Sequence, residues 1–68
     1  MKYYEKLKTI REDLEMTQSE VAKQLKTTQQ QIYKYETGKQ EMTVTKFAEL
    51  CKVYKVSADY ILGLTKYR

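Results

Sequence analysis

Three polar side chains near the middle of the sequence have the chemistry that reads base pairs. Gln29 and Gln30 open a segment with helical spacing, and Lys34 follows about one turn later. A glutamine amide donates to N7 of adenine and accepts from its N6 amino group, and a lysine donates to O6 and N7 of guanine. Gln and Lys are also good helix formers, so the alternative is an ordinary solvated helix face. The elements expected around these residues decide between the two interpretations.

Two helix starts frame this segment. Thr17 is followed by Glu20 and Thr28 by Gln31, and each pair has the spacing of a capping box, in which both side chains satisfy backbone N–H groups. Lys26–Thr27 is the expected turn between the two helices, and Gly38 suits a left-handed cap at the end of the second one. Two short helices over a tight turn, with a polar second member, predict a helix-turn-helix whose second helix enters the major groove.

Apolar residues at helical spacing predict three further helices. One covers about Tyr3 to Leu14, one about Thr43 to Lys55, and a short one is capped by Ser57 and ended by Gly63. We therefore expect one all-α, five-helix domain over residues 1–68, with a loosely held tail at about residues 65–68. The residues expected on inward faces, in chain order, are Leu7, Ile10, Arg11, Leu14, Val21, Ala22, Leu25, Ile32, Tyr35, Glu36, Phe47, Leu50, Cys51 and Tyr54.

The composition suits a small helical domain. The 68 residues are 41% hydrophobic and include no Pro and two Gly, so few residues punctuate strands and turns. A net charge of +4 permits a polyanionic partner, although a solubilising surface explains it equally well. No apolar run approaches the ~20 residues of a membrane span, and the N-terminus lacks a signal peptide's apolar core. We expect a cytoplasmic protein with no membrane partner.

Catalytic and metal-binding residues are missing from the sequence. Without histidine there is no His-based acid–base catalysis and no His-ligated metal. Cys51, the single cysteine, occupies a core position and has no His partner, which is typical of a small buried hydrophobe. No Gly-rich phosphate loop is present. The sequence therefore predicts neither an enzyme nor a cofactor or metal site.

Two charged residues and several polar ones have an expected supporting role. Arg11 and Glu36 fall on stripes that point inward, and pairing them avoids the cost of a buried unpaired charge. Gln18 opens its helix, where it either donates to a phosphate or braces Gln29. Lysines expected to contact phosphates, with a free surface charge as the alternative, are Lys39 and then Lys46 or Lys8.

Over about residues 5–64 the sequence resembles the phage repressor and Cro family of helix-turn-helix domains. The likeness rests on Thr27–Ile32 followed by Glu36–Lys39, which resemble lambdoid-phage repressors, and on Val56–Leu62, which resembles the family's fifth helix. One departure is Lys26, which stands where the family usually has a turn glycine.

The resemblance implies a homodimer on a palindromic operator of double-stranded DNA. By family likeness Gln29, Gln30 and Lys34 face base edges. By the same likeness Gln18 touches a phosphate and Gln29, and Thr28 reaches the backbone or a thymine methyl. Tyr33 departs from the small or polar residue that the family has at this place, and we expect it to contact a phosphate or a sugar edge. From their own chemistry, Lys39 is expected at a phosphate and Arg11 near the DNA backbone. The Arg11–Glu36 pair recurs, and the dimer contact is expected at Ala58, Ile61 and Leu64.

The function expected from these features is sequence-specific regulation of transcription, by repression. We expect a bacterial or phage protein that associates with the nucleoid. Two alternatives use the same fold. One is an antitoxin-type interaction module, whose main partner is a toxin. The other is a controller of restriction-modification genes, which activates as well as represses.

Overall fold

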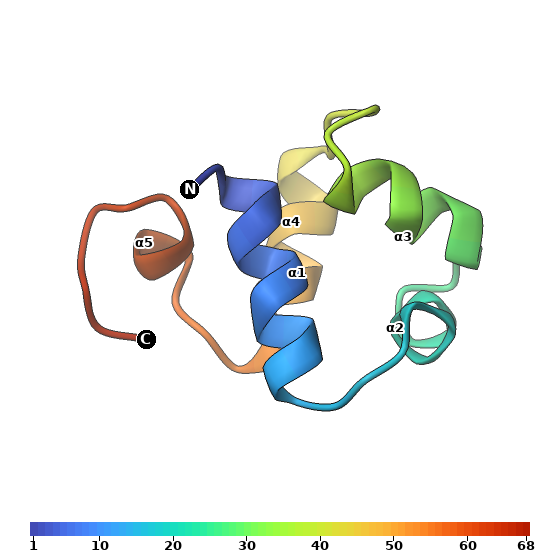
Figure 1. Cartoon of the computed structure of the whole chain (residues 1–68), viewed down its shortest axis with the longest axis horizontal. Helices are drawn as coiled ribbons and strands as arrows, with labels where there is room; N and C mark the ends of the chain where they lie inside the picture. Colours follow the sequence, from blue (N-terminus) through green and yellow to red (C-terminus); the bar gives the residue numbers. More distant parts are fainter.

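A computed structural model describes the whole chain, residues 1–68, as five helices without a strand (Figure 1). They are α1 (Tyr3–Asp13), α2 (Gln18–Gln24), α3 (Gln29–Glu36), α4 (Val44–Tyr54) and α5 (Ala58–Ile61). α1 contacts α3, α4 and α5, while α2 packs on α3. Figure 1 shows α2 and α3 on one side of α1 and α4, with α5 and the tail on the other. The all-α, five-helix prediction is confirmed. None of the helices is long and apolar enough to cross a membrane.

Four of the helices begin after a hydroxyl residue whose side chain accepts a backbone N–H three residues later. This satisfies one of the amide groups that a helix start leaves unpaired. At Thr17 the predicted capping box is complete, because the Glu20 side chain also accepts the Thr17 N–H at 2.8 Å. The cap residues are Thr17, Thr28, Thr43 and Ser57.

The second predicted capping box is only half formed. Thr28 accepts the Gln31 N–H at 3.1 Å, but Nε2 of Gln31 donates to Oε1 of Gln40 at 2.9 Å. Gln40 lies in the loop after α3, so the loop holds the side chain that was expected to reach back to Thr28. The prediction of a reciprocal box at Thr28 was therefore wrong.

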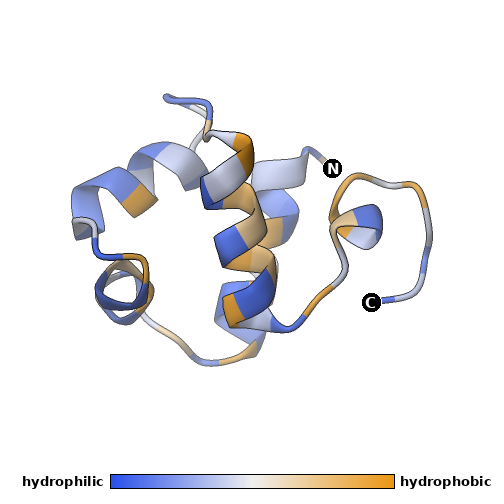
Figure 2. Ribbon diagram, turned by 180° about the vertical axis from the view of Figure 1, so that it is seen from behind, coloured by the Kyte–Doolittle hydropathy of each residue, from blue (hydrophilic) through white to orange (hydrophobic).

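Eleven residues form the core, and most of the residues expected to point inward are among them. Leu14 is an exception, with 48% of its surface exposed, because α1 ends at Asp13 and Leu14 follows as its cap. Phe47 packs against the core but is only partly buried. Figure 2 shows α3 as mainly hydrophilic and α4 with several hydrophobic positions. The core residues are Leu7, Ile10, Val21, Ala22, Leu25, Ile32, Tyr35, Leu50, Cys51, Tyr54 and Ile61.

Residues in the left-handed backbone conformation form the turns on either side of α3. Lys26 has φ 56° in the turn between α2 and α3, a conformation that costs a residue with a side chain about 1–2 kcal/mol. Gly38 follows α3 with φ 74°, as predicted for its cap. A Cβ atom at Gly38 would lie 2.5 Å from Cζ of Tyr4, so glycine also allows α1 to approach this loop closely.

The C-terminal tail returns to the start of α5, where we expected a loosely held end. The Ser57 N–H donates to the Arg68 carbonyl at 3.0 Å, and the Ser57 hydroxyl donates to the Tyr67 carbonyl at 3.3 Å. The Arg68 guanidinium lies 3.6 Å from the Asp13 carboxylate and 5.8 Å from the ring centroid of Tyr60. These contacts join residues that are not neighbours in the sequence, so local composition did not predict them.

Candidate nucleic-acid interface

The three side chains expected to read bases lie on the outer side of α3. Gln29 and Gln30 are its first two residues and Lys34 lies in its last turn, and all three are exposed. The opposite side of α3 is buried through Ile32, Tyr35 and Glu36. The helix is therefore anchored by one face and presents two amides and an ammonium group on the other. The exposed residues beside them are Thr28, the cap of α3, and Tyr33.

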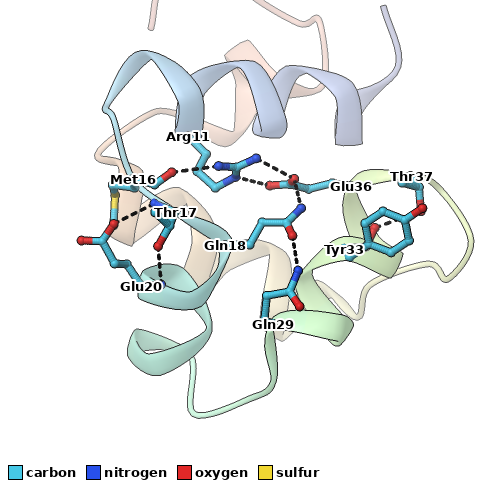
Figure 3. A network of polar contacts seen from close by, with 9 residues as sticks. All are labelled: Arg11, Met16, Thr17, Gln18, Glu20, Gln29, Tyr33, Glu36 and Thr37. Atoms are coloured by element: carbon cyan, nitrogen blue, oxygen red, sulfur yellow. Dashed lines mark hydrogen bonds and ion pairs between the residues drawn. The ribbon is translucent and has the colours of Figure 1, made fainter.

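Arg11 and Glu36 form the expected ion pair inside the protein. Nε and Nη2 of Arg11 donate to the two carboxylate oxygens of Glu36 at 2.7 and 3.0 Å, and Nη1 donates to the Met16 carbonyl at 2.8 Å (Figure 3). The two residues are 8% and 7% exposed. The hydrogen bond to Glu36 raises the pKa of Arg11, against the effect of burial. The pair joins α1 to the end of α3, which suits Arg11 to a supporting role.

Gln18 connects this ion pair to the outer surface. Its Nε2 donates to Oε1 of Glu36 at 2.8 Å, and its Oε1 accepts a hydrogen bond from Nε2 of Gln29. Figure 3 shows the four side chains as a continuous chain from Arg11 through Glu36 and Gln18 to Gln29. Of the two roles considered for Gln18, the bracing of Gln29 is therefore formed in the protein alone.

The loop after α3 folds back along the outer side of that helix. Nζ of Lys39 lies 5.2 Å from the ring centroid of Tyr33, which is a cation–π distance. The Thr37 hydroxyl donates to the Tyr33 carbonyl at 2.9 Å (Figure 3). The positive charge of Lys39 is therefore held beside the exposed ring of Tyr33, on the same helix as the glutamines.

The sequence matches the family model described as Helix-turn-helix, HTH_3, over residues 7–61. The chain belongs to this helix-turn-helix family. Its structure is similar to that of the P22 c2 repressor protein in complex with the synthetic operator 9T, crystallised in the presence of Tl⁺. The TM-score is 0.82 at 22% sequence identity, over 91% of this chain and 94% of the repressor chain. No curated protein sequence matches the chain.

Family membership confirms several expectations from the sequence. The helix-turn-helix is formed by α2 and α3, and the domain is a DNA-binding one with the fold of a phage repressor. The family is not enzymatic, in agreement with the absence of catalytic residues from the sequence. Burial also raises the pKa of the Cys51 thiol, which opposes formation of a nucleophilic thiolate.

Lys46 is used within the helix-turn-helix domain rather than left free. Its Nζ donates to the Leu25 carbonyl at 3.2 Å, at the end of α2, and lies 3.6 Å from the Glu49 carboxylate. Neither this contact nor the bond from Gln18 to Glu36 was predicted from the sequence. Both depend on how the helices pack, since one joins Lys46 of α4 to the backbone at the end of α2 and the other joins α2 to α3. The one usable signal for the bond from Gln18 was that a glutamate side chain can accept more hydrogen bonds than Arg11 alone provides.

The expected dimer contact is only partly on the surface. Ala58 is exposed and Leu64 is 73% exposed, but Ile61 is 1% exposed and belongs to the core. The assignment of Ile61 to a dimer contact was wrong, because α5 is a single turn of four residues and Ile61 anchors it. Leu62, the next residue, is 54% exposed. A groove beside it is lined by Tyr3, Met42, Thr43, Val44, Phe47, Ala48, Ala58 and Leu62.

Proposed function

We propose that this chain is a sequence-specific regulator of transcription that represses by occupying a palindromic operator as a homodimer, with α3 in the major groove. The observation that carries the proposal is the two-sided character of α3. Its buried face fixes the helix, while Gln29, Gln30 and Lys34 are exposed on the opposite side. Residues at the start of the second helix of a helix-turn-helix meet base edges.

The base contacts follow from the donor and acceptor groups of the exposed residues. Gln29 and Gln30 each offer an amide that fits adenine, and Lys34 offers an ammonium group that fits guanine. Residues proposed to contact phosphates, or to hold those that do, are Gln18, Thr28, Tyr33, Lys39 and Arg11. Phosphate contacts position the protein on the duplex without reading its sequence.

The homodimer would form through the side of the domain that carries α4 and α5. Ala58 and Leu64 remain from the expected contact, and Val44 and Leu62, which line the same groove as Ala58, add exposed apolar area. Contiguous exposed apolar residues mark interaction surfaces. A two-fold axis through this contact repeats the recognition helix, so the half-sites would lie about one helical turn, ~10 base pairs, apart.

Selection of bound sites from random DNA at a stated salt concentration tests this function. A palindrome is expected among the enriched sites. Gln29→Ala should then cost about 1–3 kcal/mol of binding and relax one base position in each half-site. Gln24→Ala, which removes an exposed amide from the end of α2, is the matched control and should leave the preference unchanged. The proposal would be contradicted if no palindrome were enriched, or if Gln29→Ala kept the same base preference as Gln24→Ala.

A further inference from the structure

Glu36 stands at the inner end of a chain of hydrogen bonds that reaches the surface at Gln29. We propose that Glu36 is a positioning residue that sets, through Gln18, the orientation of the Gln29 amide and so favours adenine over guanine at the base it reads. The inference rests on the proposed function, because it assigns a cause to the base preference of Gln29. Figure 3 shows the hydrogen bonds that link the side chains of Glu36, Gln18 and Gln29 in this order.

The first step is the acceptor character of Glu36. Its two oxygens take 2.7 and 3.0 Å hydrogen bonds from the Arg11 guanidinium, which is positively charged at any ordinary pH. Both oxygens of Glu36 are therefore already acceptors of hydrogen bonds, and neither offers a donor to Gln18. Gln18 must therefore turn its Nε2, and not its Oε1, toward Glu36, in agreement with the 2.8 Å distance between Nε2 and Oε1 of Glu36.

The second step is the constraint that the orientation of Gln18 places on Gln29. With Nε2 of Gln18 directed at Glu36, its Oε1 is directed at Gln29. A carbonyl oxygen only accepts, so Gln29 has to approach with its own Nε2. If either amide were reversed, two acceptors or two donors would face each other. The ion pair in the interior thus determines the direction of every hydrogen bond up to the surface.

The third step concerns what Gln29 has left for a base. Its amide has two N–H groups and one is taken by Gln18, so one N–H and Oε1 remain. This donor and acceptor match N7 and the N6 amino group of adenine. Guanine presents two acceptors, N7 and O6, so a free amide would have to turn both of its N–H groups toward the base to satisfy them. The hydrogen bond to Gln18 occupies one of these N–H groups and therefore disfavours guanine.

Gln30 offers an internal control. It is the next residue of the same helix, it is exposed, and its side chain makes no hydrogen bond in the protein. In the free protein, side-chain ¹⁵N relaxation should report an ordered amide for Gln29 and a mobile one for Gln30. Equal mobility of the two amides would overturn the proposal before any DNA is added.

The decisive variant is Gln18→Met, which interrupts the chain and leaves the Arg11–Glu36 pair in place. The Gln29 amide should become as mobile as that of Gln30. The preference for adenine over guanine at the base relaxed by Gln29→Ala should fall about 3- to 10-fold, the effect of one hydrogen bond. Any phosphate contact that Gln18 makes adds the same affinity at every site, so the ratio between the two bases isolates the proposed role.

Glu36→Gln gives the amide at position 36 both donors and an acceptor, so it removes the constraint on Gln18. The same fall in the adenine-to-guanine ratio is expected, with other base positions unchanged. In the Gln18→Met background Glu36→Gln should lower the ratio no further, because the two residues act in series. A purely structural role of Glu36 would weaken all positions equally and persist in that background, which would overturn the proposal.

Two kinds of failure can be told apart. If Gln29→Ala relaxes a base position but Gln18→Met leaves both the amide order and the base ratio unchanged, the role of Glu36 is wrong and the proposed function stands. If Gln29→Ala changes no base preference, the proposed function is wrong. The proposed effect of Glu36 on base selection is then wrong as well, even if the Gln29 amide is ordered.

Discussion

The two sides of the domain expose different kinds of side chain. On the α2–α3 side the exposed or half-buried polar residues Gln18 and Gln29 are bonded to each other and to the interior. On the α4–α5 side Val44, Leu62 and Leu64 are 84%, 54% and 73% exposed and lie outside the core. The polar surface is organised within one chain, whereas the apolar surface gains stability only when a partner removes it from water.

This difference agrees with the proposal that the α2–α3 side reads bases and the α4–α5 side forms the dimer. A base-reading surface needs side chains already held in position, because ordering them at the moment of binding reduces affinity. An association surface needs apolar area, which contributes about 25 cal/mol per Å² when it is buried. The following predictions test whether the two sides are as different as their contacts indicate.

The largest expected effect separates two apolar residues of the α5 side. Ile61→Ala should lower the free energy of unfolding by about 2–5 kcal/mol, because it leaves a cavity in the core. Leu64→Ala should change it by no more than about 0.5 kcal/mol. Denaturant unfolding measures both. Leu64→Ala should instead weaken dimerisation in sedimentation experiments, and equal losses of stability in the two variants would show that Leu64 is a core residue.

On the α2–α3 side, the start of α2 is expected to depend on its cap. Thr17→Ala should lower the free energy of unfolding by about 0.5–2 kcal/mol, because the Glu20 N–H loses its acceptor. Thermal unfolding measures the change. Thr45→Ala is the matched control, since Thr45 is an exposed threonine inside α4 that caps nothing. A similar loss from Thr45→Ala would mean that the cap contributes no more than any exposed threonine.

Lys39 distinguishes positioning from base reading on the α3 side. Lys39→Ala should weaken binding to all DNA sequences and reduce the slope of log affinity against log salt concentration by about one unit. Lys52→Ala removes an exposed lysine from α4 and should leave that slope unchanged. Affinities measured over a series of salt concentrations test both variants. A changed base preference in Lys39→Ala would assign Lys39 to base reading.

The smallest effect is a pH dependence at the same cap. The Thr17 N–H, followed by the Thr17 hydroxyl, holds the pKa of Glu20 below its ordinary value of 4.5. Folding therefore lowers the proton affinity of the Glu20 carboxylate. The contribution of this carboxylate to the stability of the folded state is complete above pH 4.5 and declines as pH falls through the lowered pKa. Glu20→Gln should flatten the decrease of melting temperature below that pH. An unchanged acid profile would mean that Glu20 makes no pH-dependent contribution.

Local features of the fold were predicted well because they depend on neighbouring residues. The caps at Thr17, Thr28 and Ser57 and the left-handed Gly38 each follow from a few consecutive positions. Ile61 was misassigned because its dimer contact was taken from the family resemblance, and a single turn of helix has too few residues for periodicity to reveal that this side chain is buried. The full capping box at Thr28 failed because Gln40 competes for Gln31 from outside the helix.

The amino-acid sequence by itself determined the five helices, the helix-turn-helix spacing and the polar outer face of α3, since these depend on spacings of three or four residues and on the residue types that end a helix. Only the tertiary structure decided that Glu36 orients Gln18 and Gln29, and that the tail returns to Ser57. The first of these contacts joins side chains of α2 and α3, and the second joins Ser57 to backbone carbonyls of the tail, so their geometry exists only once these parts of the chain have packed.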